Sequence, residues 1–310
     1  MYHGLRVAVV VPAFREERHV GDVIRTMPDI VDHILVVDDA SPDETFAVAE
    51  AAADARTEVI RHEVNKGVGG AIVTGHRRAL ELGADVSVVM AGDAQMDPDH
   101  LPDLLGPIAD DGYGFTKANR FYSATSFAGM PKLRILGNVA LTFMTKAASG
   151  YWNLVDPQNG YTAITRQALE RLPLGKLAER YEFENDQLIW LNILGVRALD
   201  VPIPAVYGAE VSTLRIHRVV PRLLRLLFIG FWRRFWRKYV LWSFSPIALL
   251  FLTGLMLLLV GLVAGVFAIV QSIGPASAST GTWLLAVAPT LVATQFLVHA
   301  LVLDIEATPR

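Results

Sequence analysis

The sequence predicts an α/β protein with a Rossmann-like, mostly parallel sheet and flanking helices, followed by interfacial amphipathic helices and two transmembrane helices. The first observation is that short apolar runs rich in β-branched residues alternate with helical patterns four times before residue 91. Such alternation is typical of parallel strands joined by right-handed crossover helices. The second observation is a pair of apolar stretches beyond residue 246, each long enough to cross a bilayer.

The charges divide the chain into two parts. Only two of the 31 acidic residues lie beyond residue 210, against nine of the 28 basic residues. Residues 1–210 therefore carry a net charge of −10, and residues 211–310 a net charge of +7. A basic, apolar part attached to an acidic part favours a membrane partner. The absence of cysteine excludes disulfides and thiolate metal sites.

The first two strands are predicted from continuous apolar runs at residues 7–11 and 34–37. A helix is expected between them, at about residues 16–27. Ser41, followed by Pro42 and two acidic residues, predicts the start of an alanine-rich helix that runs to about residue 55.

A glycine-rich segment follows the third predicted strand, at residues 58–61. Residues 65–71, Asn-Lys-Gly-Val-Gly-Gly-Ala, open a helix that runs to about residue 82. They match neither the Gly-x-Gly-x-x-Gly of a dinucleotide site nor the Gly-Lys-Ser/Thr of a P-loop. The glycines therefore either cradle a phosphate at the helix N-terminus or form a tight loop.

The fourth predicted strand, at residues 86–90, delivers polar side chains at its end. Asp93, Gln95 and Asp97 follow it closely, and open α/β sheets bind ligands at the carboxyl ends of their strands. Carboxylate and amide oxygens at this spacing suit Mg²⁺ or Mn²⁺ better than Zn²⁺. The alternative interpretation is an acidic surface loop in which Asp97 and Pro98 begin a helix.

The regular alternation weakens beyond residue 100. The predicted elements there are a strand ending at 118–120, a helix of about fifteen residues from 131, a polar turn at 156–161, a strand at 162–165, a helix at 181–194 with Glu184 and Asp186 near its start, and an extended edge or loop segment at 201–207 with two prolines.

The C-terminal part carries membrane signals. Residues 215–238 interleave eight basic residues with leucine and aromatic residues, the pattern of amphipathic helices in a membrane interface. Nucleic-acid binding is the competing interpretation of such a stretch. It is disfavoured because residues 247–270 carry no charge, and residues 283–303 have only Gln295 and His299 as strongly polar side chains.

These two spans predict a membrane hairpin. The loop between them, residues 271–282, has no Lys or Arg, whereas the flank before residue 247 has eight. The positive-inside rule therefore places the N-terminal part and the C-terminus in the cytoplasm. We expect a multi-pass protein of the plasma membrane, divided into residues 1–213, 214–243 and 244–310.

Four motifs resemble those of family 2 glycosyltransferases, which have the GT-A fold. They are Val-Pro-Ala-Phe-Arg-Glu-Glu at 11–17, Val-Val-Asp-Asp-Ala-Ser-Pro-Asp at 36–43, Asn-Lys-Gly at 65–67 and Gly-Asp-Ala-Gln-Met-Asp-Pro at 92–98. Within that family, Asn-Arg-Phe at 119–121, Pro-Lys-Leu-Arg at 131–134 and Asp-Pro-Gln-Asn-Gly-Tyr at 156–161 are similar to the polyprenyl-phosphate sugar synthases. The resemblance covers about residues 5–215 and agrees with a tail of two spans.

The resemblance implies a catalytic domain at 1–213 that moves a hexose, with inversion, from a nucleotide sugar of UDP-glucose or GDP-mannose type to a dolichyl or undecaprenyl phosphate. Asp93 and Gln95 would hold Mg²⁺ or Mn²⁺ on the donor pyrophosphate. The implied catalytic residues are Asp93, Arg120, Arg134 and Asp186. The other implied contacts are Pro12, Ala13, Glu16, Asp38, Asp39, Lys66 and Gly67 for the nucleotide sugar, and Arg120, Lys132, Arg134, Asn138, Gln158, Asn159, Ser212 and Arg215 for the acceptor.

The sequence departs from the family pattern at two places. Ala91 stands where the family usually has the first Asp of an Asp-x-Asp motif that ends at Asp93. The metal would then have fewer protein ligands and lean on the pyrophosphate and water. Residues 207–214 also lack the Arg and Lys that often accompany Ser212.

Three functions stay open at this stage. A lipid phosphate arrives as an anion, because its second pKa is near ~6, so it needs arginines to position it and Asp186 or Glu184 would only orient groups. A lipid hydroxyl acceptor would instead need Asp186 as a general base. Ala91 suggests an inactive sugar-nucleotide binder that serves as a membrane scaffold. The sequence leaves the oligomeric state open, a homo-oligomer included.

Overall fold

The computed structural model describes residues 1–121, 132–204, 216–274 and 277–309. Contacts group the chain into two units, one from Met1 to Phe231 and one from Trp232 to Thr308. We call them the sheet unit and the hairpin unit. The predicted segment boundaries at residues 213 and 243 stay predictions.

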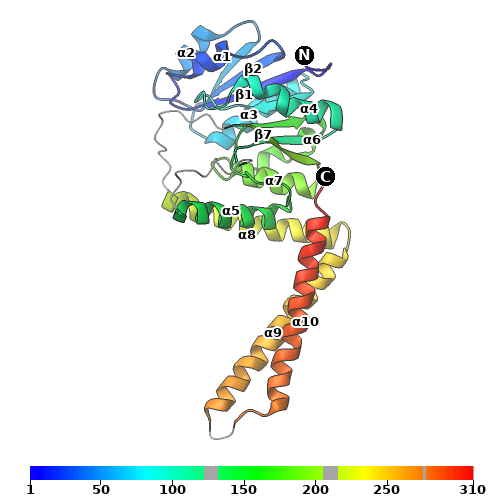
Figure 1. The fold of residues 1–310 in the computed structure, drawn as a ribbon. Helices are drawn as coiled ribbons and strands as arrows, with labels where there is room; N and C mark the ends of the chain where they lie inside the picture. Colours follow the sequence, from blue (N-terminus) through cyan, green and yellow to red (C-terminus); the bar gives the residue numbers. More distant parts are fainter. Residues whose placement is uncertain (122–131, 205–215, 275–276, 310) are drawn as a thin grey trace. The chain divides into compact units, whose positions relative to one another are not determined.

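The sheet unit is built on a seven-stranded sheet in the order β3-β2-β1-β4-β6-β5-β7 (Figure 1). Strand β6 is antiparallel to both of its neighbours, and the other six strands share one direction. A mostly parallel sheet is therefore confirmed. The strands are β1 (Val7–Ala13), β2 (His33–Asp38), β3 (Thr57–Arg61), β4 (Val86–Val89), β5 (Phe115–Asn119), β6 (Thr162–Thr165) and β7 (Ala198–Pro202).

Helices cover both faces of the sheet. Alternate residues of β1 point to opposite faces, so Val9 packs in one cluster with α1 and α4, and Val10 in another with α3. Gly75 of α3 lies so close to Val10 that any larger side chain there would collide with it. The helices are α1 (Val20–Arg25), α2 (Thr45–Ala52), α3 (Val68–Glu81), η1 (Pro98–His100), α4 (Leu101–Asp111), α5 (Lys132–Ser149), α6 (Arg166–Arg171), η3 (Leu174–Lys176) and α7 (Phe183–Ile193).

The predicted helix start at Ser41 is wrong. Helix α2 begins at Thr45, and Glu44 occupies the N-cap position. The Ser41 hydroxyl is buried and instead accepts a hydrogen bond from the backbone N–H of Arg15, 3.1 Å away. The capping side chain is therefore used to join the loops that follow β1 and β2. The expected helix at 16–27 is also shorter, since it forms only at Val20–Arg25.

Helix α8 (Ile216–Arg234) crosses the boundary between the units. Within the sheet unit, its Leu223 and Leu227 are buried in the cluster that contains Leu188 and Ile189 of α7. A short π-helical segment, η4 (Phe235–Leu241), continues it in the hairpin unit. The predicted amphipathic helix after residue 215 is thus observed from Ile216 onward.

The hairpin unit contains two long apolar helices, α9 (Pro246–Ile273) and α10 (Thr280–Glu306), which pack on each other. Both are long and apolar enough to cross a membrane, and in each the most apolar stretch is mostly exposed. They are therefore not buried core helices of a soluble domain. Ala286, Ala293 and Ala300 recur every seven residues and are buried in the contact, as small residues are at membrane helix interfaces.

Candidate functional site

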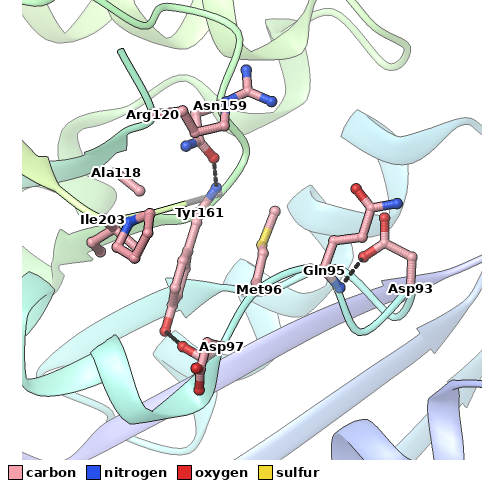
Figure 2. A pocket seen from close by; sticks show the side chains of 10 residues that line it. Asp93, Gln95, Met96, Asp97, Ala118, Arg120, Asn159, Tyr161 and Ile203 are labelled. Atoms are coloured by element: carbon pink, nitrogen blue, oxygen red, sulfur yellow. Dashed lines mark hydrogen bonds between the residues drawn. The ribbon is translucent and has the colours of Figure 1, made fainter. Parts of the chain in front are cut away.

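A pocket opens at the edge of the sheet where the parallel strands end. It is lined by the loop after β4, the end of β5 and the start of β6 (Figure 2). Ligands of open α/β sheets bind at this edge. The residues that line it are Asp93, Gln95, Met96, Asp97, Ala118, Arg120, Asn159, Tyr161, Ile203 and Pro204.

Asp93 and Gln95 lie next to each other at one end of this pocket (Figure 2). The Asp93 Oδ1 accepts a hydrogen bond from the Gln95 backbone N–H, at 3.1 Å, which fixes the carboxylate relative to the turn. Asp97 caps the helix that follows, because its Oδ1 accepts from the Asp99 N–H at 2.9 Å. The alternative interpretation of Asp97 as a helix start is therefore confirmed.

The oxygens at this end fit a hard divalent cation that takes most of its ligands from elsewhere. Among the residues that the structure describes, no three His, Cys, Asp or Glu side chains cluster as a metal site. One carboxylate with one amide oxygen is nevertheless a common protein contribution to Mg²⁺, which keeps water and substrate phosphates as its other ligands. Asp93 and Gln95 would hold such an ion.

Arg120 lines the same pocket, and its guanidinium is held in place by the carboxylate of Asp156. Its Nε and Nη2 donate to the two carboxylate oxygens of Asp156 at 2.7 and 3.0 Å, and its backbone N–H donates to the same carboxylate at 3.2 Å. Asp156 is fully buried, whereas the Arg120 side chain is 35% exposed. This fork-to-fork pair fixes the guanidinium plane and leaves part of it at the pocket.

The segment 156–161 is bonded to helix α7, to strand β5 and to the loop after β4. The Gln158 Nε2 donates to Asn185 of α7 at 3.2 Å. The Asn159 carbonyl accepts from the Nζ of Lys117 in β5. The Tyr161 hydroxyl donates to the Asp97 carbonyl at 3.1 Å (Figure 2). The predicted polar turn is therefore a fixed wall of the pocket, and Gln158 and Asn159 are held by protein partners.

The residues predicted for the nucleotide sugar meet at the ends of β1 and β2. Pro12 and Ala13 pair with Val37 and Asp38 across the two strands. Asp38 is buried, and its carboxylate accepts from the Ser41 N–H at 3.1 Å and faces the Arg61 Nε at 3.3 Å. A hollow of about 370 Å³, lined by Ala40, Ser41, Arg61, His62 and Glu63, lies beside them.

Asp39 organises the glycine-rich loop. Its carboxylate accepts from the backbone N–H groups of Lys66 and Gly67 at 2.8 and 2.7 Å, and His62 lies 2.7 Å away. A Cβ at Gly67 would come within 2.6 Å of the Glu179 carbonyl, and the Gly70 N–H donates to that carbonyl at 3.0 Å. These contacts favour the tight-loop interpretation over a phosphate cradle, because the loop amides already have partners.

The two acidic residues at the start of α7, Glu184 and Asp186, have different surroundings. Asp186 is buried, and its Oδ2 accepts from the Ala178 N–H at 3.0 Å, so it holds the segment before the helix. Glu184 lies beside the 156–161 turn, since a Cβ at Gly160 would be 3.9 Å from its Oε1. Burial raises the pKa of Glu184 above its ordinary value.

The fold and the pocket agree with a family assignment from comparison. Residues 8–173 match the model named Glycosyl transferase family 2, which is more than half of the chain. The chain belongs to glycosyltransferase family 2. The predicted family and enzyme class are thus confirmed.

Two similar proteins are named as transferases to a polyprenyl phosphate. The UDP-N-acetylglucosamine–dolichyl-phosphate N-acetylglucosaminyltransferase of Methanococcus voltae is 31% identical over 216 residues, which are 65% of this chain and 86% of that protein. The undecaprenyl-phosphate mannosyltransferase of Micrococcus luteus is 32% identical over 206 residues, 64% of this chain and 83% of that protein.

A solved glycosyltransferase shares the fold. Glucosyl-3-phosphoglycerate synthase of Mycobacterium tuberculosis, in a complex with Mn²⁺, UDP and glucosyl-3-phosphoglycerate, aligns with a TM-score of 0.54 and 23% identity, over 74% of this chain and 80% of that one. The likeness confirms the predicted GT-A type of fold.

Several predicted acceptor residues cannot be placed by their side chains. Ser212 and Arg215 lie outside the described residues. Lys132 and Arg134 lie in α5, but their side chains are outside the part of the chain that the structure describes. Asn138 is half-buried on the same helix. Their roles in this family 2 enzyme stay predictions.

Two residues near the pocket were missed from the sequence. Lys117 and Asp200 pair across β5 and β7; Lys117 is 1% exposed, and burial raises the pKa of Asp200 to about 6. A lysine next to a threonine in a short strand resembles a surface residue. The available signal was its position three residues before Arg120, which places it in the strand that ends just before that arginine.

Proposed function

We propose that this family 2 glycosyltransferase transfers a hexose or N-acetylhexosamine from a nucleotide sugar to a polyprenyl phosphate at the cytoplasmic face of the plasma membrane. One observation supports it most. A carboxylate and an amide suited to a divalent cation, Asp93 and Gln95, share a pocket with a clamped arginine, Arg120. One end of the pocket suits a diphosphate with its metal ion, and the other suits a second phosphate.

The donor side needs its leaving group neutralised. Asp93 and Gln95 would hold Mg²⁺ or Mn²⁺, which as a Lewis acid stabilises the charge that develops on the departing diphosphate. The nucleoside would extend toward the ends of β1 and β2, where Pro12, Ala13 and the buried Asp38 meet. Because the Ala91 side chain has no oxygen, the protein would supply few ligands to the metal ion. The donor diphosphate itself would supply further oxygens.

The acceptor side needs positioning but no base. An oxygen of the lipid phosphate attacks the anomeric carbon, and the bond from that carbon to the diphosphate oxygen breaks. The nucleoside diphosphate leaves with the electron pair, and no proton moves. Arg120, held in plane by Asp156, would orient the attacking phosphate. The engagement of Asp186 with the Ala178 N–H agrees with a reaction that does not use it as a base.

Two helices of the sheet unit have exposed apolar faces, which supports the proposal that the acceptor lies in a membrane. Helices α5 and α8 both pack on the cluster around α7 and lie on the same side of the sheet (Figure 1). Both expose large apolar side chains at helical spacing: Val139 and Phe143 on α5, and Val220, Leu224 and Phe228 on α8. Such faces suit the interface of a bilayer, where a polyprenyl phosphate presents its headgroup.

The test is a transfer assay with the full chain in detergent. Radiolabelled UDP-glucose, UDP-N-acetylglucosamine and GDP-mannose are each offered with undecaprenyl or dolichyl phosphate, in Mn²⁺, Mg²⁺ or EDTA. We expect one acid-labile labelled lipid that EDTA abolishes. Asp93→Asn should lower transfer about 100-fold or more, since a metal contributes several kcal/mol. Asp99→Asn, which changes an exposed acid in η1 six residues further on, is the matched control.

Two results would contradict the proposal. Transfer to a diacylglycerol or ceramide hydroxyl, abolished by Asp186→Asn, would establish a hydroxyl acceptor instead. Binding of a nucleotide sugar without transfer to any acceptor would support the inactive binder that Ala91 suggests.

A further inference from the structure

Lys117 is a buried cation directly behind the pocket. It is the third residue of β5, where it pairs with Thr162 of β6 and Asp200 of β7. Its Nζ donates to the carbonyl of Asn159, a residue that lines the pocket. An ammonium group that is 1% exposed is costly to bury unless anions compensate it.

Three carboxylates supply that compensation. Burial lowers the pKa of Lys117, and the negative charges of Asp156, Glu184 and Asp200 act in the opposite direction. One of the three, Asp156, is also the clamp of Arg120. Lys117 and Arg120 therefore both act on the carboxylate of Asp156, and a change at the buried lysine alters the charge near the partly exposed arginine.

The same group fixes the backbone that carries the clamp. The Asp200 Oδ2 accepts from the Val155 N–H at 2.5 Å, and the Asn153 Nδ2 donates to the Ala198 carbonyl at 2.8 Å. Strand β7 thus holds the segment before Asp156, while Lys117 holds the segment after it at Asn159. The Asp156 carboxylate is set between these two attachments.

We propose that Lys117 is a positioning residue for the acceptor phosphate: by holding the Asn159 carbonyl and neutralising the carboxylates around Asp156, it keeps part of the Arg120 guanidinium directed to the pocket. The inference rests on the proposed function, because it assigns the phosphate to Arg120. Without the ammonium group, less positive charge would compensate the carboxylate of Asp156, and Arg120 would be drawn toward it and away from the ligand.

The experiment compares Lys117→Met with a matched control. Lys146 also donates to a backbone carbonyl of the same region, that of Trp152 at 2.8 Å, and its charge also acts on Asp200. Unlike Asn159, however, Trp152 does not line the pocket, so Lys146→Met leaves the pocket wall in place. Transfer is measured at varied donor and varied polyprenyl phosphate. Lys117→Met should raise the acceptor KM about tenfold or more, which corresponds to ~1.4 kcal/mol, and change the donor KM less than about twofold. Lys146→Met should leave both near the wild-type values.

A second variant tests the charge argument. Lys117→Met with Asp200→Asn removes one cation and one anion together, so it should fold at least as well as the single variant and recover part of the acceptor KM. Equal rises in both KM values, equal effects of the two lysine variants, or no recovery in the double variant would overturn the role of Lys117. A wild-type protein that transfers to no polyprenyl phosphate would instead overturn the proposed function, and this inference with it.

Discussion

The two units bury ionic groups in different ways. In the hairpin unit, the Arg234 guanidinium donates to both oxygens of Asp304 at 2.6 and 3.1 Å, and the Tyr239 hydroxyl bonds to both partners. In the sheet unit, the charges of three carboxylates act on Lys117, and one of them, that of Asp156, also binds Arg120. One of the oxygens there, Oδ1 of Asp200, is buried and finds no hydrogen-bond partner among the described residues.

The difference distinguishes an ion pair that affects the stability of the fold from a group of charges that takes part in the function of the pocket. In the hairpin, the Arg234 guanidinium and the Asp304 carboxylate are joined at two points and share the Tyr239 hydroxyl, with the charge of Lys238 also acting on the pair. In the sheet unit, burial shifts the pKa values of Lys117, Glu184 and Asp200 near the pocket, and groups of this kind are typical of functional sites. The hairpin pair should therefore affect stability, and the sheet group should affect binding and pH dependence.

The largest effect on stability is expected from breaking the hairpin pair. Asp304→Ala leaves the guanidinium of Arg234, which is 1% exposed, without its carboxylate. The loss of one partner of a buried pair costs about 3–5 kcal/mol. The thermal midpoint of the detergent-solubilised full chain should fall accordingly, while nucleotide-sugar binding by the sheet unit should persist.

Two variants decide whether the pair itself is responsible. Glu306→Ala changes an exposed acid two residues further on. It should leave the free energy of unfolding within about 0.5 kcal/mol of the wild-type value. Arg234→Met with Asp304→Leu replaces both charges by apolar groups and should recover most of the loss. Equal effects of Asp304→Ala and Glu306→Ala would show that the two units do not differ in this way.

A smaller effect, with a pH signature, is expected at Asp200. Burial is the main reason that its pKa rises from 3.8 to about 6; Lys117 and the Val155 N–H act against the rise, and Asp156 adds to it. The folded state thus holds this proton more tightly than the unfolded chain. Its contribution to stability is complete below about pH 3.8 and is lost as the pH rises through about 6.

Asp200→Asn removes this loss because an amide does not ionise. Each pKa unit corresponds to ~1.4 kcal/mol, so the variant should gain at most about 3 kcal/mol relative to the wild type between pH 4 and 7. Thermal unfolding of both proteins across this range measures the difference. A stability difference that stays constant with pH would mean that Asp200 ionises normally in the folded chain.

The sequence was sufficient where one property of a continuous segment decides the structure. The run at 7–11 is apolar throughout, and the run at 86–90 is interrupted only by Ser87, because β1 and β4 are buried on both faces. The two spans were equally clear from length and composition. Asp93 and Gln95 lie in one turn, so their proximity followed from spacing alone.

Long-range pairing could not be predicted in the same way. Strand β6 enters the sheet between β4 and β5 in the opposite direction, which no local pattern in Thr162–Thr165 specifies. Asp156 and Arg120 are 36 residues apart, and their clamp depends on that insertion. Ser41 had the residue type of a helix cap, but its hydroxyl was taken by Arg15, a competing partner that only the fold reveals.

The smallest effect is expected from adding a carboxylate to the pocket. Ala91→Asp creates an Asp-x-Asp pair with Asp93 and gives a divalent cation a second carboxylate oxygen. Ala91 is partly exposed, so the larger side chain has room. The Mn²⁺ concentration for half-maximal transfer should fall about fivefold, or ~1 kcal/mol, with little change in the acceptor KM.

Ala94→Asp is the matched control, since it adds the same charge to the same loop. Ala94 is exposed and has a φ of 58°, a left-handed conformation that Asp adopts more readily than most residues. If only Ala91→Asp lowers the Mn²⁺ requirement, the ion is bound by oxygens at Asp93 and the gain comes from a direct ligand. If both variants lower it equally, the added charge attracts cations to the pocket in general, and the carboxylate of Asp93 is not where the metal is held. The net charge of −10 on residues 1–210 would then gather cations at the pocket, in contrast to the two-point pairing of Arg234 with Asp304 in the hairpin.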